Sequence, residues 1–433
     1  MLTCFSTSRL GWLLFCFATA IDLTSVSSAE QVGTKDNLDA AGKVTAKDRG
    51  EFLAGKKVDA ANKNVAKRVV TDAADYYLYR ITHRSSYKFQ AVQDEFARDM
   101  EAAKKSDASF KALLGLALVT SMKNVLAEQK IDKGDGVIIV NAAMMLPTMG
   151  RLKQDDVGNY LVELVNAEKT HQIVRFYASK ALKEYMPITV QPNENDLDLT
   201  NKGQNAKRKQ DAAYVDALVN FIEHPAEVKS MSQPEIEAVR FVRREAIISL
   251  SAAASPAVLA VNKKSQVKKD LLEGPVAPTL LKVLAKDGLQ PPPTLQEKVE
   301  AVLGLCAMKY ADMPEYNPDV ATYLIGQTLT NFASEYSVDL GNFGKGVEKK
   351  KIPFLPWKHD AKRLRDGLKK FADNTGTPSA KALNGLAEPI LKSIAEHESV
   401  NVNALRTQLQ APDWLPKDNK AFKTLKTPAI PLK

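Results

Sequence analysis

The sequence predicts an all-α protein, and three observations support this. Ala, Leu, Val and Lys dominate the long segments and aromatic residues make up only 7% of the chain. Ala and Leu lose little side-chain freedom in a helix, so this composition favours helices. Apolar residues also recur with helical spacing, as Val58, Val65, Val69 and Ala73 do. Strand patterns are nearly absent, because the apolar run 137–140 continues into residues that favour a helix.

The N-terminus has the pattern of a secretory signal peptide. Arg9 is the only charged residue before Asp22, residues 10–21 are nearly all apolar, and residues 27–29 form a small-residue cleavage site. The alternative is a membrane anchor, but a span needs about 20 apolar residues. We therefore interpret residues 1–29 as a signal peptide, with Ala20 as the alternative last residue, and expect an exported protein, periplasmic or extracellular. The sequence has no Asn-x-Ser/Thr site, which favours a bacterial source.

Cysteine content and charge limit the mature chain further. Removal of the signal leaves Cys306 as the only cysteine, so no internal disulfide is expected. No later apolar stretch reaches the length of a membrane span, so we expect no integral span in the mature chain. The formal net charge is +9, and residues 341–371 hold ten Lys or Arg against three acids. The C-terminal part is therefore the basic end.

Helical periodicity begins near Lys57, after a polar, Gly-punctuated segment, 30–55, that we expect to be a poorly ordered lead-in. Further helices are predicted at about 87–105, 109–129, 137–150, 155–167, 171–186, 207–223, 233–253, 275–286, 294–310, 318–335, 359–373 and 379–397. We expect an N-terminal helical region at 30–187, a linker or long loop at 188–206, a repeat region at 207–335, and a basic C-terminal region and tail at 336–433.

Several helix starts carry clear signals. Ser232 with Glu235, and Thr294 with Glu297, have the spacing of capping boxes, in which the hydroxyl and the carboxylate satisfy free backbone amides. Asn317-Pro318 and Thr377-Pro378 each place a capping residue before a proline at the first helical position. These signals predict where four of the helices begin.

Two predicted helices share the pattern V-R-x-x-A-x-x-x-L, in which the apolar residues lie on one face and the arginine can reach a loop acid or carbonyl. Its residues are Val174, Arg175, Ala178 and Leu182 in the first copy and Val242, Arg243, Ala246 and Leu250 in the second. A weaker third copy lies at 297–305. The pattern resembles the second helix of HEAT and armadillo-type repeats, over about residues 155–310. The resemblance implies an α-solenoid of helical hairpins that acts as a scaffold and binds another protein through its repeat surface.

No catalytic or cofactor-binding motif accompanies this pattern. The five histidines are not spaced as metal ligands, and Cys306 lies in an apolar helix, where a packed thiol is the simpler interpretation. We therefore expect a non-enzymatic protein without metal or cofactor. An enzyme with a cryptic acidic site is the remaining alternative of this class.

The basic segment 341–371 is a second candidate binding element. Its candidate anion-binding residues are Lys349, Lys350, Lys351, Trp357, Lys358, Lys362, Arg363 and Arg365. Basic groups interleaved with aromatic residues suit an anionic envelope polymer or lipid headgroups. Nucleic acid is not expected as a partner of an exported protein. The simpler alternative is a solvated loop and helix face, with Trp357 fixing the loop to the last repeat.

Overall fold

The computed structural model describes residues 46–82, 88–128, 136–186, 202–224, 228–256, 258–259, 272–273, 275–285, 288–310, 316–343, 355–411, 414–417, 420–421 and 430. The chain divides into two compact units, Met1–Tyr185 and Met186–Lys433, which are described separately. The predicted signal peptide lies outside the described residues. Helices form nearly all of the regular structure, so the all-α prediction is confirmed.

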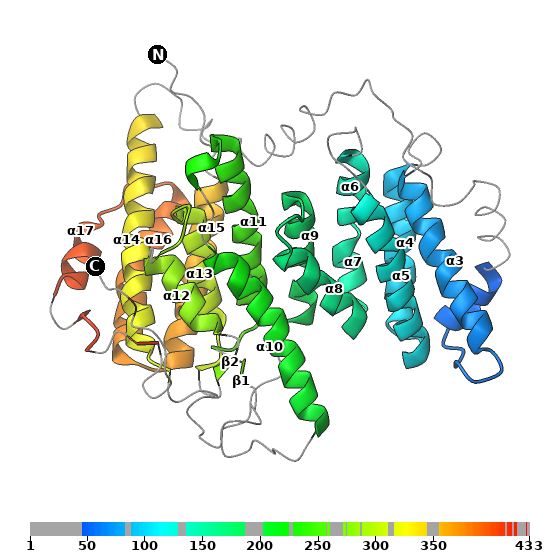
Figure 1. The fold of residues 1–433 in the computed structure, drawn as a ribbon. Coiled ribbons are helices and arrows are strands. Elements are labelled where there is room, and N and C mark those ends of the chain that lie inside the picture. The colour runs from blue at the N-terminus through cyan, green and yellow to red at the C-terminus, as the bar shows by residue number, and fades with distance from the viewer. Residues whose placement is uncertain are drawn as a thin grey trace. The chain divides into compact units, whose positions relative to one another are not determined.

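Unit 1 is built from helices arranged in two rows (Figure 1). In one row α5 packs against α3 and α8, and in the other α7 packs against α4 and α9. The helices are α3 (Lys63–Thr82), α4 (Phe89–Ala103), α5 (Ala108–Glu128), α6 (Gly136–Ala143), α7 (Leu146–Gly150), α8 (Asp155–Asn166) and α9 (Gln172–Leu182), followed by a 3₁₀ turn at Lys183–Tyr185. The predicted helix 137–150 is thus interrupted between α6 and α7.

The N-terminal lead-in is more ordered than the sequence suggests. Residues 46–53 are helical, and Phe52 is fully buried against Phe110, with the two rings stacked 5.1 Å apart. Arg49 lies 3.4 Å from Asp99 and also donates to the Tyr77 hydroxyl. The expectation of a poorly ordered segment was wrong for these residues, because one aromatic anchor and one ion pair outweigh a polar composition.

Unit 2 also consists of two rows of helices (Figure 1). In one row α10, α12, α14 and α16 are successive neighbours, and in the other α13 packs between α11 and α15. The helices are α10 (Lys202–Glu223), α11 (Gln233–Ser251), α12 (Val276–Ala285), α13 (Leu295–Ala307), α14 (Pro318–Phe343), α15 (Leu355–Thr375), α16 (Pro378–Glu396) and α17 (Asn403–Leu409), with a 3₁₀ turn at Val228–Ser230. Each consecutive pair from α10 to α15 therefore contributes one helix to each row.

The only strands among the described residues are β1 (Val258–Leu259) and β2 (Leu272–Glu273). They pair antiparallel, with Val258 opposite Glu273 and Leu259 opposite Leu272. Strands of two residues form no core of their own. They lie within the chain between α11 and α12 and do not change the fold class.

Both predicted capping boxes are present. The Glu235 carboxylate accepts from the Ser232 backbone amide at 2.6 Å, and the Glu297 carboxylate accepts from the Thr294 amide at 2.7 Å. Thr377 caps α16 by accepting from the amide of Ala380. The local signals thus give these helix starts correctly.

Helix ends differ more from the prediction. Helix α10 starts at Lys202, inside the predicted 188–206 linker, of which residues 188–201 lie outside the described residues. Helix α14 runs eight residues beyond the predicted end at 335, and α17 occupies part of the predicted tail. Ala421 and Ile430 are also buried, and the Ala421 carbonyl accepts from the Asn317 amide at 2.8 Å. Tertiary contacts therefore order part of the Pro- and Lys-rich tail.

Close approach of α13 to its neighbours depends on glycine. A Cβ on Gly304 would lie 2.1 Å from the Ser251 hydroxyl oxygen, 2.7 Å from the Ser251 Cβ and 2.9 Å from a methyl of Leu280. A Cβ on Gly385 in α16, by contrast, would meet no atom within 4 Å. Gly304 therefore sets the distance of α13 from α11 and α12, whereas Gly385 faces open space.

We expect Gly304→Ala to destabilise unit 2 by about 1–3 kcal/mol, because the added methyl overpacks a filled interface. The measurement is urea unfolding followed by tryptophan fluorescence, since Trp357 and Trp414 both lie in unit 2. Gly385→Ala is the matched control and should stabilise by up to about 1 kcal/mol through helix propensity. Equal effects of the two substitutions would contradict the packing argument.

Candidate functional site

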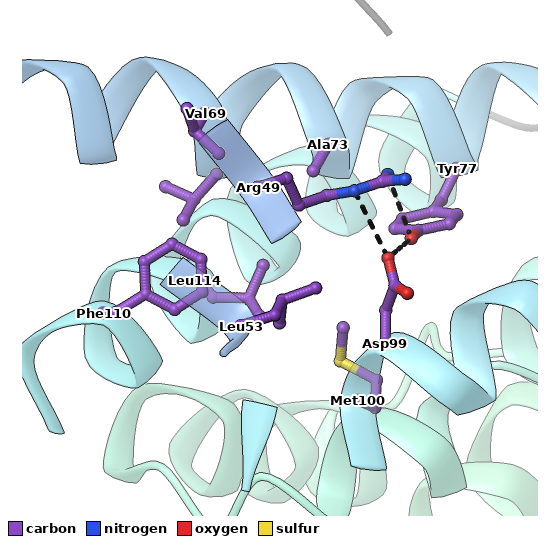
Figure 2. Close-up of a pocket in the computed structure, with 10 residues that line it drawn as sticks. Arg49, Leu53, Val69, Ala73, Tyr77, Asp99, Met100, Phe110 and Leu114 are labelled. Carbon is purple, nitrogen blue, oxygen red and sulfur yellow. Dashed lines mark hydrogen bonds and ion pairs between the residues drawn. The ribbon is translucent and has the colours of Figure 1, made fainter. Parts of the chain in front are cut away.

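A small pocket lies among the described residues of unit 1 (Figure 2). Arg49, Tyr77 and Asp99 form its polar side, and apolar side chains such as Leu53 and Leu114 form the rest. The space open to the centre of a water molecule is about 10 Å³, which is roughly what one water needs. The pocket is therefore too small for an organic substrate.

The polar groups of this pocket bind one another. Arg49 contacts Asp99 and Tyr77, and the Tyr77 hydroxyl donates to the Asp99 carboxylate (Figure 2). Burial, together with the negative charge of Asp99, raises the pKa of Tyr77 well above its ordinary value, so the hydroxyl stays protonated. The cluster joins residues 46–53 to α3 and α4 and has the character of a structural network.

The described residues also offer no arrangement typical of a metal or thiol enzyme. They contain no group of three or more His, Cys, Asp or Glu side chains placed to hold a metal ion. Cys306 is buried, and burial raises the pKa of its thiol far above the ordinary value, which disfavours the reactive thiolate.

One described helix is long and apolar enough to cross a membrane. It is the Ala108–Leu126 part of α5, with a mean hydropathy of 1.2, and half of this stretch is buried in the protein. A buried core helix passes the same test, so this is weak evidence for a span.

The sequence pattern V-R-x-x-A-x-x-x-L falls on α9 and α11, and its weaker copy falls on α13. Its apolar residues are all buried: Val174, Ala178 and Leu182 in α9, and Val242, Ala246 and Leu250 in α11. Each of these helices is the second of a consecutive pair, after α8, α10 and α12. The shared pattern thus coincides with a shared place within each pair.

The basic residue of the pattern makes two kinds of contact. Arg175 donates to the carbonyl of Ala167, just beyond α8, and the buried Lys298 donates to the carbonyl of Leu284 in the last turn of α12 at 2.7 Å. In both cases the second helix of a pair satisfies a free carbonyl at the end of the first. Arg243 instead donates to the Glu297 carboxylate of α13 at 2.6 Å.

A second ionic contact joins α11, α13 and α15 through Glu300. Lys298 faces α12, and Glu300, two residues further along α13, lies on the opposite side of the helix, which we call the outer side of this row. Glu300 accepts from Arg244 of α11 at 2.8 Å and from Arg363 of α15 at 2.6 Å. Burial acts to raise the pKa of Glu300, but the hydrogen bonds from Arg363 and Arg244 outweigh it, so the pKa lies below its ordinary value. Asp360 also lies 3.2 Å from Arg363. Arg363 is therefore committed to this network and is not free for an external anion.

Two aromatic residues of the predicted basic and aromatic segment, Trp357 and Phe371, pack inside unit 2. The Trp357 indole packs on Phe332 and Tyr336 and donates to the Asp339 carboxylate at 3.1 Å. Phe371 is fully buried. Trp357 thus holds the start of α15 against α14, as in the simpler alternative, and does not face an external ligand.

The remaining predicted anion-binding residues divide into two groups. Lys349, Lys350 and Lys351 lie outside the described residues. Lys358, Lys362 and Arg365 recur on one side of α15, and Lys369, which is not among the predicted anion-binding residues, continues the same row. Their i, i+4, i+7 spacing was visible in the sequence. Only the tertiary structure shows that Arg363 pairs with Glu300 and Asp360 and does not belong to this row.

We expect Arg243→Leu to destabilise unit 2 by about 3–5 kcal/mol, because Glu297 would remain buried without its partner. Arg365→Leu, which removes a half-buried arginine 3.8 Å from the exposed Asp366, should change stability by less than about 1 kcal/mol. Urea unfolding of both variants measures this difference. Similar small losses would show that the buried pair contributes no more than a surface pair.

The lowered pKa of Glu300 predicts a pH dependence. A carboxyl whose pKa is lower in the folded than in the unfolded state, where it is about 4.3, stabilises the fold above that value, and the contribution is lost as the pH falls through the folded pKa. We therefore expect the stability difference between the native chain and Glu300→Gln to be largest above about pH 5 and to shrink towards pH 3. Urea unfolding at a series of pH values tests this, with Glu396→Gln controlling for the loss of an exposed carboxylate. A difference that stays constant with pH would contradict the assignment.

No family model matches the chain, and no curated protein matches it. Function is therefore inferred from how the helices of each unit pack and from the charges that they expose.

Proposed function

We propose that this chain is an exported, non-enzymatic helical-repeat scaffold that binds another protein through the outer side of α11, α13 and α15. The observation that carries the proposal is the packing of unit 2, in which consecutive helix pairs each add one helix to the same two rows. In repeat proteins of the HEAT type, pairs packed in this way leave an extended surface for binding. Export rests on residues 1–29, whose pattern is that of a signal peptide.

The equivalence of the pairs supports a repeat. Arg175 and Lys298 occupy the same place in the shared pattern, and each binds a carbonyl at the end of the preceding helix. A chance match between short sequence patterns would not require equivalent contacts. In unit 1 the α8 and α9 pair, and in unit 2 the α12 and α13 pair, are therefore the best-supported repeat units.

The outer side of the α11, α13 and α15 row is mixed in character. Gln296 and Ala307 are exposed near the two ends of α13, and Leu303 of the same helix is half-buried. Ile248 of α11 is also half-buried. The Arg244–Glu300–Arg363 contact crosses the same side, so its charges are largely satisfied within the protein. Such a surface, partly apolar with few free charges, suits a protein partner better than a small ionic ligand.

The test is capture of a partner from envelope extract by the full chain, compared between two matched variants. Gln296→Arg with Ala307→Arg places two cations on the outer side of α13. Asn331→Arg with Ala382→Arg places the same charge at exposed positions of α14 and α16. We expect a partner that the native chain and the second variant retain and that the first variant loses by tenfold or more. Capture of background proteins only, or equal retention by both variants, would overturn the proposed surface.

A further inference from the structure

Helix α15 carries a row of four basic side chains that no close ion pair among the described residues neutralises. We define the α15 basic row as Lys358, Lys362, Arg365 and Lys369, which are spaced by four, three and four residues. Residues at these spacings lie one above the other on a helix. The row therefore extends over about 16 Å along one side of α15, given a rise of about 1.5 Å per residue.

The charges in this row are available to a ligand. Among the described residues no ion pair involves Lys358, Lys362 or Lys369, and Arg365 has only a long contact of 3.8 Å with the neighbouring Asp366. Lys362 and Lys369 are exposed, and Lys358 and Arg365 are half-buried. The row differs in this respect from Arg363, whose charge is used by Glu300 and Asp360.

The row also lies away from the proposed protein-binding side. Arg363 contacts Glu300 of α13, and a Cβ on Gly367 would lie 3.3 Å from a methyl of Leu303, so positions 363 and 367 face α13. At about 100° per residue, the average direction of the basic row is roughly 150° from these two positions. A ligand on the row would therefore leave the outer side of α13 uncovered.

We propose that the α15 basic row binds the backbone of an extended polyphosphodiester. Its cations are separated by about 4.5–6 Å along the helix axis. A phosphodiester chain with six bonds per repeat is at most about 7 Å long per repeat when extended, by the same geometry that gives a three-bond peptide unit about 3.5 Å. The flexible lysine stems, each with three donors, can adjust to the remaining difference.

Two observations favour a polyphosphodiester over a membrane surface and over base recognition. The aromatic residues of α15 are Trp357 and Phe371, and both pack inside unit 2. The helix therefore exposes no Trp, Tyr or Phe side chain to insert among lipid headgroups or to stack on a base. A single row one side chain wide also matches a linear ligand better than a plane of charge.

The experiment measures binding of the full chain to a fluorescently labelled 12-unit abasic deoxyribose-phosphate oligomer, by anisotropy between 20 and 200 mM salt. Each phosphate contact on a single strand contributes about −0.7 to the slope of log affinity against log salt. Three or four contacts therefore predict a slope of about −2 to −3. Oligothymidylate of the same length should bind within about threefold of the abasic oligomer, because only the backbone is recognised.

The variant Lys362→Gln with Lys369→Gln removes two exposed charges and should reduce the slope by about 1.4 and the affinity at 50 mM salt at least tenfold. Lys209→Gln with Lys229→Gln removes two exposed lysines of unit 2 outside the row and is the matched control, expected to retain the slope of the native chain. All substituted positions are exposed, so folding should persist, and circular dichroism checks this.

Three results would overturn the proposal. The first is an equal loss of affinity for the oligomer in the two double-lysine variants, and the second is binding of a 12-residue polyglutamate as tight as that of the oligomer. The third is binding of phosphatidylglycerol vesicles that depends on the α15 basic row, without binding of the oligomer. The last would assign the row to a membrane surface. None depends on capture of a protein partner, so failure here and failure of the scaffold proposal are separate outcomes.

Discussion

Burial of charge on α13 is the constraint on which the packing of unit 2 depends. Glu297, Lys298 and Glu300 lie within one turn of this helix and are exposed by only 1%, 5% and 3%. Buried charges are very unfavourable unless they are paired. Each of the three reaches a different partner: Glu297 binds Arg243 of α11, Lys298 binds the end of α12, and Glu300 binds α11 and α15. One helical turn therefore fixes the register of three neighbouring helices.

The ion pairs of this turn of α13 also determine which charges of α11 and α15 are paired and which remain exposed. Apolar contacts alone would tolerate small shifts of α11 and α15 along α13, but ion pairs of 2.6–2.8 Å do not. Gly304 and Gly367 allow the helices to approach closely enough for these pairs to form. The charges of the arginines that complete the network are thereby paired within the protein. Free positive charge is left on the other side of α15, where no neighbouring acid pairs with Lys358, Lys362 or Lys369 among the described residues.

The two halves of the predicted basic and aromatic segment thus have different roles. Trp357 joins α15 to α14 through ring contacts and a hydrogen bond, which is a structural role. Lys362 and Lys369, one and three turns further along, face solvent. Sequence proximity had suggested one composite binding element. A helix places residues at adjacent positions about 100° apart, so neighbours in sequence point to different surroundings.

The sequence by itself determined the fold class, most of the helix positions and several helix starts, because these depend on local periodicity and on capping within four residues, as at Ser232 and Thr294. It also identified the basic residues of α15 and the shared pattern of α9 and α11. Only the tertiary structure decided that Phe52 and Arg49 order the segment before α3 and that the chain after 409 packs back through Ala421. It also decided that Arg363 pairs with Glu300 of α13 while the neighbouring Lys362 is exposed. These outcomes depend on contacts between residues roughly 30 to 100 positions apart, and local sequence carries no record of which distant partner a side chain will meet.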